Sequence, residues 1–192
     1  FDLNSSQRMS LRRLLKKNRL QTLNLFDFSL TLDLCDALPF SSMDKLRTLW
    51  IRDTCIEDST ALNCSLGTSG FQLNNFHLYD TTLNRVDITT LCQAVFQWTC
   101  LNRLALINIL PSTNDDNSSP HSHSLHEVNY RFSMLKNLMN AIARCSTLQH
   151  LYLMDTGIDD SMVQRLGEML SALGEVKAVY IGSNHITSRG FY

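Results

Sequence analysis

The stretch "LQHLYLMDTGIDDSMVQRLGEMLSAL", residues 148–173, changes its hydrophobic period halfway along. Its first leucines follow the pattern L-x-x-L-x-L, and the last two are two residues apart, which places both on one face of a short strand. Residues typical of a helix start come next: Asp159, Asp160 and Ser161. Apolar residues then recur at helical spacing, at Met162, Leu166, Met169, Leu170 and Leu173. The stretch therefore predicts a strand followed by an amphipathic helix.

The L-x-x-L-x-L pattern recurs along the chain, which indicates an internal repeat. It occurs five more times, as Leu20-Leu23-Leu25, Leu46-Leu49-Ile51, Leu73-Phe76-Leu78, Leu101-Leu104-Leu106 and Val176-Val179-Ile181. Together with the copy that starts at Leu148, the first positions are separated by 26, 27, 28, 47 and 28 residues. The interval of 47 corresponds to one period plus an insertion.

Each unit of this repeat would be a strand with a returning helix, and such a unit cannot bury its apolar face alone. Stacked copies can do so, with parallel strands on one wall and helices on the other. The helical wall is wider than the strand wall, so the stack should curve. We therefore expect an α/β fold in the form of a curved solenoid, with parallel strands on the concave face and helices on the convex face.

This pattern resembles the leucine-rich repeats, and the helical return with its 26–28 period is similar to the ribonuclease-inhibitor-like class. The resemblance covers residues 20–192. It implies a single repeat domain over residues 1–192, with six repeats that start near 20, 46, 73, 101, 148 and 176. The ninth position of each repeat, usually Asn in this family, is Asn only at Asn184. We therefore expect less regular turns here, most of all near Phe28 and Ile109.

Residues 110–128 are expected to form an inserted surface loop, because Ser, Asn, Asp and Pro dominate the segment before Leu125. A helix over about residues 130–144 should follow it and restore the repeat. His121, His123 and His126 could bind a metal, but nothing in the sequence would preorganise them. We therefore expect a solvated loop without a metal site, and a partner contact or phosphorylation stays open for it.

The two ends of the chain suggest a longer parent protein. The chain begins with an expected helical segment, Met9 to Lys17, and stops soon after the last strand, without an evident polar cap at either end. Repeat stacks need capping units. We therefore expect further repeats or another domain to flank this segment.

Composition narrows the classes of function. Of the 192 residues, 44% are hydrophobic and 18% are charged, and the net charge is −1. This is a globular composition without the basic excess that nucleic-acid or anionic-membrane binding favours. No apolar run is long enough to span a membrane. The six cysteines form no C-x-x-C pair, which argues against structural zinc and favours reduced thiols, buried as small hydrophobes, in a cytoplasmic setting.

Catalytic motifs are missing from the sequence as well. It contains no phosphate-binding or dinucleotide-binding glycine motif, no zinc-protease motif and no serine-hydrolase motif. We therefore expect no enzymatic activity, no catalytic residues and no cofactor.

Strand alternation assigns the residues that should face the concave wall. The fifth and seventh repeat positions give an aromatic band, with polar and apolar neighbours, that fits a protein-binding surface: Phe26, Trp50, Arg52, His77, Tyr79, Tyr152, Met154 and Tyr180. The eighth positions give a carboxylate row: Asp27, Asp53, Asp80 and Asp155. Carboxylates on adjacent strands should repel, so a basic partner could bind there. Alternatively, the rings cover one another and the carboxylates accept hydrogen bonds from turn N–H groups.

Repeats of this period resemble the C-terminal repeat domains of cytosolic NOD-like innate immune receptors, which implies a ligand sensor or an autoinhibitory cover. We therefore expect a non-enzymatic recognition module that binds a protein ligand or another domain of its parent chain. Two alternatives stay open. The segment around Cys145 is similar to the repeats of F-box ubiquitin-ligase subunits. The other alternative is a solenoid that regulates a GTPase or actin, for which Arg52 and Arg103 are the only concave arginines, and neither is evidently held rigidly enough for a catalytic finger. The sequence leaves the ligand and the oligomeric state undetermined.

Overall fold

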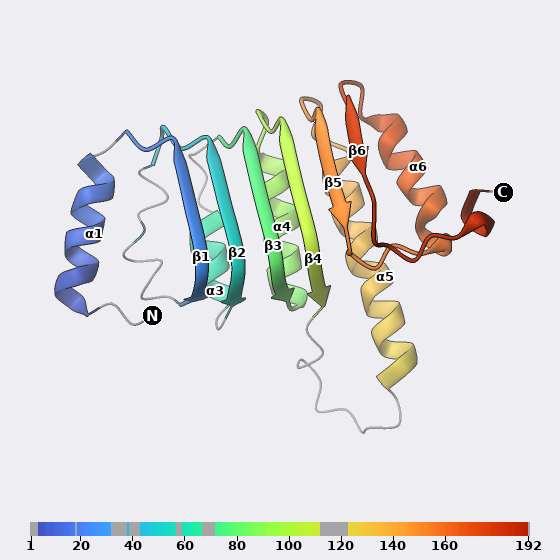
Figure 1. The fold of residues 1–192 in the computed structure, drawn as a ribbon, viewed down its shortest axis with the longest axis horizontal. Helices are drawn as coiled ribbons and strands as arrows, with labels where there is room; N and C mark the ends of the chain where they lie inside the picture. Colours follow the sequence, from blue (N-terminus) through green and yellow to red (C-terminus); the bar gives the residue numbers. More distant parts are fainter. Residues whose placement is uncertain are drawn as a thin grey trace.

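The computed structural model describes residues 4–17, 19–31, 38, 43–56, 59–66, 72–111 and 123–191. Within these residues, six parallel strands form one open sheet in chain order (Figure 1). They are β1 Thr22–Leu30, β2 Thr48–Ile56, β3 Asn75–Leu83, β4 Arg103–Pro111, β5 His150–Met154 and β6 Ala178–Tyr180. The expected α/β class and the parallel pairing of the six repeated segments are confirmed.

Helices accompany the strands along the chain: α1 Ser5–Lys17, α3 Ser59–Leu66, α4 Arg85–Gln97, α5 His123–Ile142 and α6 Val163–Ala172, with the short 3-10 helices η2 Asp160–Met162 and η3 Ser188–Phe191. Helices α3, α4 and α5 lie behind the sheet in Figure 1, and each packs against the next. The front of the sheet carries no helix within the described residues (Figure 1). We call this front the open face.

Equivalent positions of the repeat lie beside one another across the sheet. Leu49 of β2 pairs with Phe76 of β3, which pairs with Leu104 of β4. The apolar triads of the four central repeats are at most 2% exposed: Leu46, Leu49, Ile51, Leu73, Phe76, Leu78, Leu101, Leu104, Leu106, Leu148, Leu151 and Leu153. The triads of the first and last repeats are partly buried. Burying one such side chain contributes about 1.5–3 kcal/mol, so these triads hold the strands against the helices.

Every repeat carries a residue with left-handed backbone at its eighth position. The φ angles are 53°, 50°, 50°, 51°, 51° and 58° for, in order, Asp27, Asp53, Asp80, Asn108, Asp155 and Ser183. Asp and Asn tolerate this region better than most side chains because their short polar groups can bond locally. The ladder between β1 and β2 skips this residue on both strands, and the register is the same before and after it. The backbone conformation therefore accounts for the acidic row.

The regularity of these turns corrects one expectation. The residues just before Phe28 and Ile109 have φ angles that match those of the other repeats. By this measure, the two turns are as regular as the others. The first four strands also extend past the left-handed residue to nine residues each, which is longer than the short strands that the pattern predicts.

The ninth position bonds in two different ways. Asn184 donates from Nδ2 to the carbonyl oxygens of Leu153, at 2.6 Å, and Ile181, at 2.8 Å, and it accepts from the Thr156 N–H at 3.0 Å. It therefore joins the last two turns. The threonine hydroxyls at this position differ: Thr81 Oγ1 donates to the Tyr79 carbonyl of its own strand at 2.8 Å, whereas Thr156 Oγ1 donates to Asn184 Oδ1 of the next repeat at 3.2 Å.

The boundaries of the insertion differ from those expected. Strand β4 runs to Pro111 and α5 already begins at His123, before the predicted start near residue 130. His121 and the side chains of His123 and His126 lie outside the described residues, so the expectation that they bind no metal stays a prediction. The described residues contain no group of three His, Cys, Asp or Glu side chains that could hold a metal ion.

The predicted burial of the cysteines is confirmed only in part. Cys145 is buried and donates from Sγ to the Val95 carbonyl at 3.6 Å, and burial raises the pKa of the Cys145 and Cys92 thiols to about 11. By contrast, Cys55, Cys64 and Cys100 are exposed, so they do not serve as small core residues.

Within the described part of the chain, none of the helices combines the length and the apolar character needed to cross a membrane.

The left-handed backbone at Asp155 leads to a test. Asp155→Val should lower the free energy of unfolding by about 1–2 kcal/mol, because a β-branched side chain is strained at positive φ. Asp155→Gly should stay within about 0.5 kcal/mol of the wild type, since glycine adopts this φ freely but costs entropy in the unfolded chain. Urea denaturation measures both. The control is Met154→Val, one residue earlier at ordinary φ, and an equal loss in the two valine variants would contradict the explanation.

Candidate functional site

The structure places the predicted aromatic band on the open face. Phe26 and Tyr180 are 52% and 47% exposed, respectively. Four further side chains are half-buried: Trp50, Tyr79, Tyr152 and Met154. Because these side chains stand on paired strands, their positions are fixed by the sheet, as a binding surface on a rigid scaffold requires.

The rings form two groups on this face. Trp50 stacks on His77 with ring centroids 4.0 Å apart and 12° between the planes, and it stacks on Tyr79 at 5.7 Å and 18°. We call these residues the three-ring stack. On the other side of β4, Tyr152 stacks on Tyr180 at 4.4 Å and 4°, and we call these two the tyrosine pair. The alternative that the rings cover one another across strands is therefore confirmed, although the groups remain part of the surface.

His77 differs from the other predicted contacts because it is only 4% exposed. Its Nδ1 lies 3.2 Å from the Tyr79 hydroxyl oxygen. Burial lowers the pKa of His77 from 6.5 to about 4, and the positive charge of Arg103 acts in the same direction. The imidazole is thus neutral at pH 7. Since it is covered, His77 supports the stack and does not itself offer a contact to a partner, which corrects the prediction.

Ala105 separates the two groups of rings. In the parallel ladder it lies between His77 and Tyr152. It has no exposed surface although it stands on the open face, so neighbouring side chains close over it. Burial raises the pKa of Tyr79, the Tyr152 phenol raises it further, and Arg103 and Arg52 lower it. The ring groups therefore flank a small buried residue, and Arg103 lies within electrostatic range of His77 and Tyr79.

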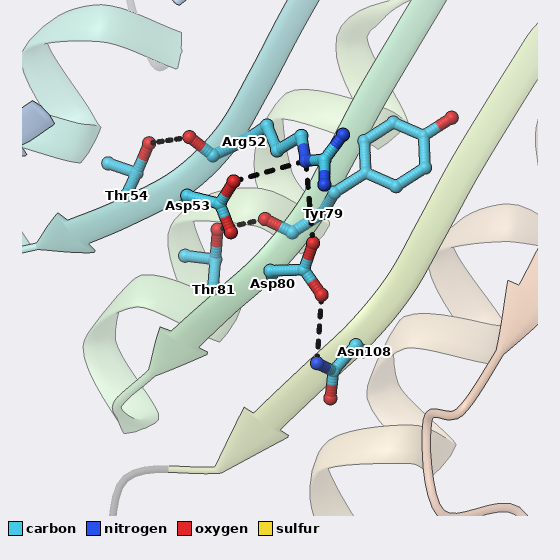
Figure 2. A network of polar contacts seen from close by, with 7 residues as sticks. All are labelled: Arg52, Asp53, Thr54, Tyr79, Asp80, Thr81 and Asn108. Carbon is cyan, nitrogen blue, oxygen red and sulfur yellow. Dashed lines mark hydrogen bonds and ion pairs between the residues drawn. The ribbon is translucent and has the colours of Figure 1, made fainter. Parts of the chain in front are cut away.

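The chain supplies its own cation to the carboxylate row, as Figure 2 shows. Arg52 Nε lies 3.1 Å from Asp53 Oδ2 and 3.6 Å from Asp80 Oδ2. Asn108 Nδ2 donates to Asp80 Oδ1 at 2.8 Å. The expected repulsion between Asp53 and Asp80 is relieved within the molecule, so it gives no argument for a basic partner there. Asn108 was not predicted, although its place in the eighth position was a usable signal.

Asp27 and Asp155 differ from the two paired carboxylates. Both are exposed, and neither takes part in an ion pair within the described residues. Arg52, which was predicted as a partner contact, pairs with Asp53 and Asp80 within the chain. Exposed ion pairs of this kind contribute only about 0–1 kcal/mol, so a partner could still draw Arg52 away from them.

A recess lies on the helical side of the sheet, between α4 and α5. It is an open groove of about 310 Å³ lined by Ile88, Thr89, Cys92, Gln93, Phe96, Asn137, Asn140, Ala141 and Arg144. Phe96 is 54% exposed, and the Arg144 guanidinium carbon lies 5.2 Å from its ring centroid. Sequence reasoning did not predict this groove, because it depends on how two helices from different repeats pack.

The buried imidazole leads to a test of pH dependence. The unfolded chain binds a proton at His77 near pH 6.5 and the folded chain only near pH 4. Stability should therefore rise with pH between these values, by up to about 1.4 kcal/mol per pH unit from this group. His77→Phe keeps a ring in the stack and should flatten this part of the profile in urea denaturation.

The matched control for this test is His185→Gln, which removes an exposed histidine. It should leave the difference between pH 4 and pH 6.5 unchanged. A His77→Phe profile as steep as that of the wild type would show that His77 is not the group responsible.

No protein-family model matches this chain, and a comparison with curated proteins found no significant match.

Proposed function

We propose that the chain is a curved stack of leucine-rich repeats of the ribonuclease-inhibitor-like type and that its open face recognises another protein. The proposal for the fold is supported by the 26–28 residue period, the six in-register strands and the helical return in successive repeats. A curvature toward the strand side follows from the greater width of helices.

The single observation that carries the recognition function is the half-exposed aromatic surface on the open face. Tyr and Trp dominate the energetics of protein interfaces because they offer large, rigid contact areas. Here the tyrosine pair and the three-ring stack are already ordered by ring contacts. A partner would therefore lose little side-chain entropy at these positions when it binds.

Within this proposal, we favour a NOD-like receptor type of module, which would bind a protein ligand or another domain of its parent chain. The F-box alternative has one supporting residue, since Cys145 is buried three positions before Leu148. Cys100 does not follow that pattern, because it is exposed and directly precedes Leu101. The aromatic surface serves either alternative and is the part that can be tested directly.

A selection from a displayed library of random peptides tests the recognition surface. Peptides selected on the wild-type chain should bind Tyr152→Ser and Tyr180→Ser at least about tenfold more weakly, which is the scale of an interface hot spot. Biolayer interferometry with the purified peptides measures the affinities. Trp50 and Tyr79 are less suitable because their removal would uncover buried His77.

The control variants are Phe96→Ser and Phe132→Ser, which remove exposed aromatic rings of 54% and 41% exposure from the helical side. They should leave the affinities unchanged. Selected peptides that tolerate both tyrosine substitutions but lose affinity in the helical variants would show that the open face is not the binding surface.

A further inference from the structure

Arg103 stands on the open face between the two groups of rings. It is the first residue of β4, where it pairs with Asn75 on one side and His150 on the other. Two residues later comes Ala105, which shares its face because side chains alternate along a strand. Ala105 has no exposed surface, so neighbouring side chains cover it, and the positive charge of Arg103 acts on the His77 and Tyr79 side chains of β3.

The Arg103 guanidinium lacks a partner within the described part of the chain. Its Nε is hidden from solvent and makes no hydrogen bond, and no ion pair involves this side chain. The residue as a whole remains partly exposed. A buried charged donor without an acceptor is costly, and native structures rarely keep one without a reason. An acceptor that arrives with a partner would supply that reason by binding the terminal nitrogens of the guanidinium, since the hidden Nε is out of its reach.

The surroundings of Arg103 favour an anion. Tyr79 lies within electrostatic range of Arg103 and of Tyr152, and its hydroxyl oxygen lies 3.2 Å from His77 Nδ1. With the proton of the neutral imidazole on Nδ1, His77 donates to this oxygen, and the phenol keeps its own proton for a ligand. The carboxylates of the open face stand five positions farther along the strands, which is about 16 Å away at 3.3 Å per residue. They are too distant to neutralise Arg103, and a ligand acceptor would meet no competing carboxylate near it.

We propose that Arg103, with the Tyr79 and Tyr152 hydroxyls, forms a subsite for a carboxylate of a protein partner, next to rings that take an apolar side chain of the same segment. This inference rests on the proposed recognition function and specifies its partner as an acidic–apolar peptide segment. A carboxylate fits a single guanidinium because it can accept two parallel hydrogen bonds. A phosphate dianion would call for more than one cation.

An NMR titration tests the subsite with 3-phenylpropionate, which joins one carboxylate to one ring. The probe should shift the Arg103 Nε–Hε resonance in a saturable way, with a dissociation constant in the millimolar range that is typical of so small a ligand. The uncharged 3-phenylpropanamide should bind about fivefold or more weakly, and phenyl phosphate should bind no better than the carboxylate.

Substitutions of Arg103 distinguish a role of its charge in binding from a role in stabilising the fold. Arg103→Gln should weaken 3-phenylpropionate binding about tenfold, Arg103→Lys less so, and Arg144→Gln on the helical side should have no effect. Because Arg103 has no partner among the residues that the structure describes, Arg103→Gln should change the melting temperature by less than about 4 °C. A larger fall would mean that Arg103 is held by structural contacts and would overturn the premise.

The outcomes distinguish this inference from the proposed function. Equal binding of acid and amide, or unchanged binding by Arg103→Gln, would overturn the carboxylate subsite and leave the aromatic surface standing. If neither probe shifts any open-face resonance up to about 50 mM, the subsite is also wrong. The peptide selection with Tyr152→Ser and Tyr180→Ser decides the recognition function independently of either result.

Discussion

The burial of three apolar side chains per repeat, between the sheet and the helices, is the constraint on which the rest of this structure depends. In the third repeat these are Leu73, Phe76 and Leu78, all at most 1% exposed. Because side chains alternate along a strand, their burial directs the residues between them to the opposite face. Truncating one triad leucine would cost about 2–5 kcal/mol. The positions of the aromatic rings on the open face thus follow from the core behind them.

The order and register of the strands could be predicted because the period fixes which positions meet. Leu49 opposite Phe76 is a consequence of spacing alone. The environment of each open-face side chain could not be predicted in the same way, since it depends on the size of its neighbours. His77 is buried by rings from its own and the adjacent strand, and the Arg52–Asp80 ion pair depends on which rotamer a long side chain adopts.

The acidic row shows how one backbone requirement can shape a surface. A left-handed residue at the eighth position favours Asp or Asn, so carboxylates gather at the carboxyl ends of the strands whatever the partner is. Basic residues lie nearer the amino ends, where Arg47, Arg103 and Lys177 occupy the second or third repeat positions. The open face therefore has a charge gradient along the strands, and a partner segment would be oriented by it before the rings make contact.

The cysteines in the helical layer have a practical consequence. Cys145 lies against α4 through its contact with the Val95 carbonyl, and its thiol remains protonated at neutral pH, as does that of Cys92. Alkylating reagents attack the thiolate, so the buried Cys145 sulfur reacts slowly while it stays packed against α4. The rate at which Cys145 becomes modified therefore measures how often α4 and α5 separate, and no label has to be added to the chain.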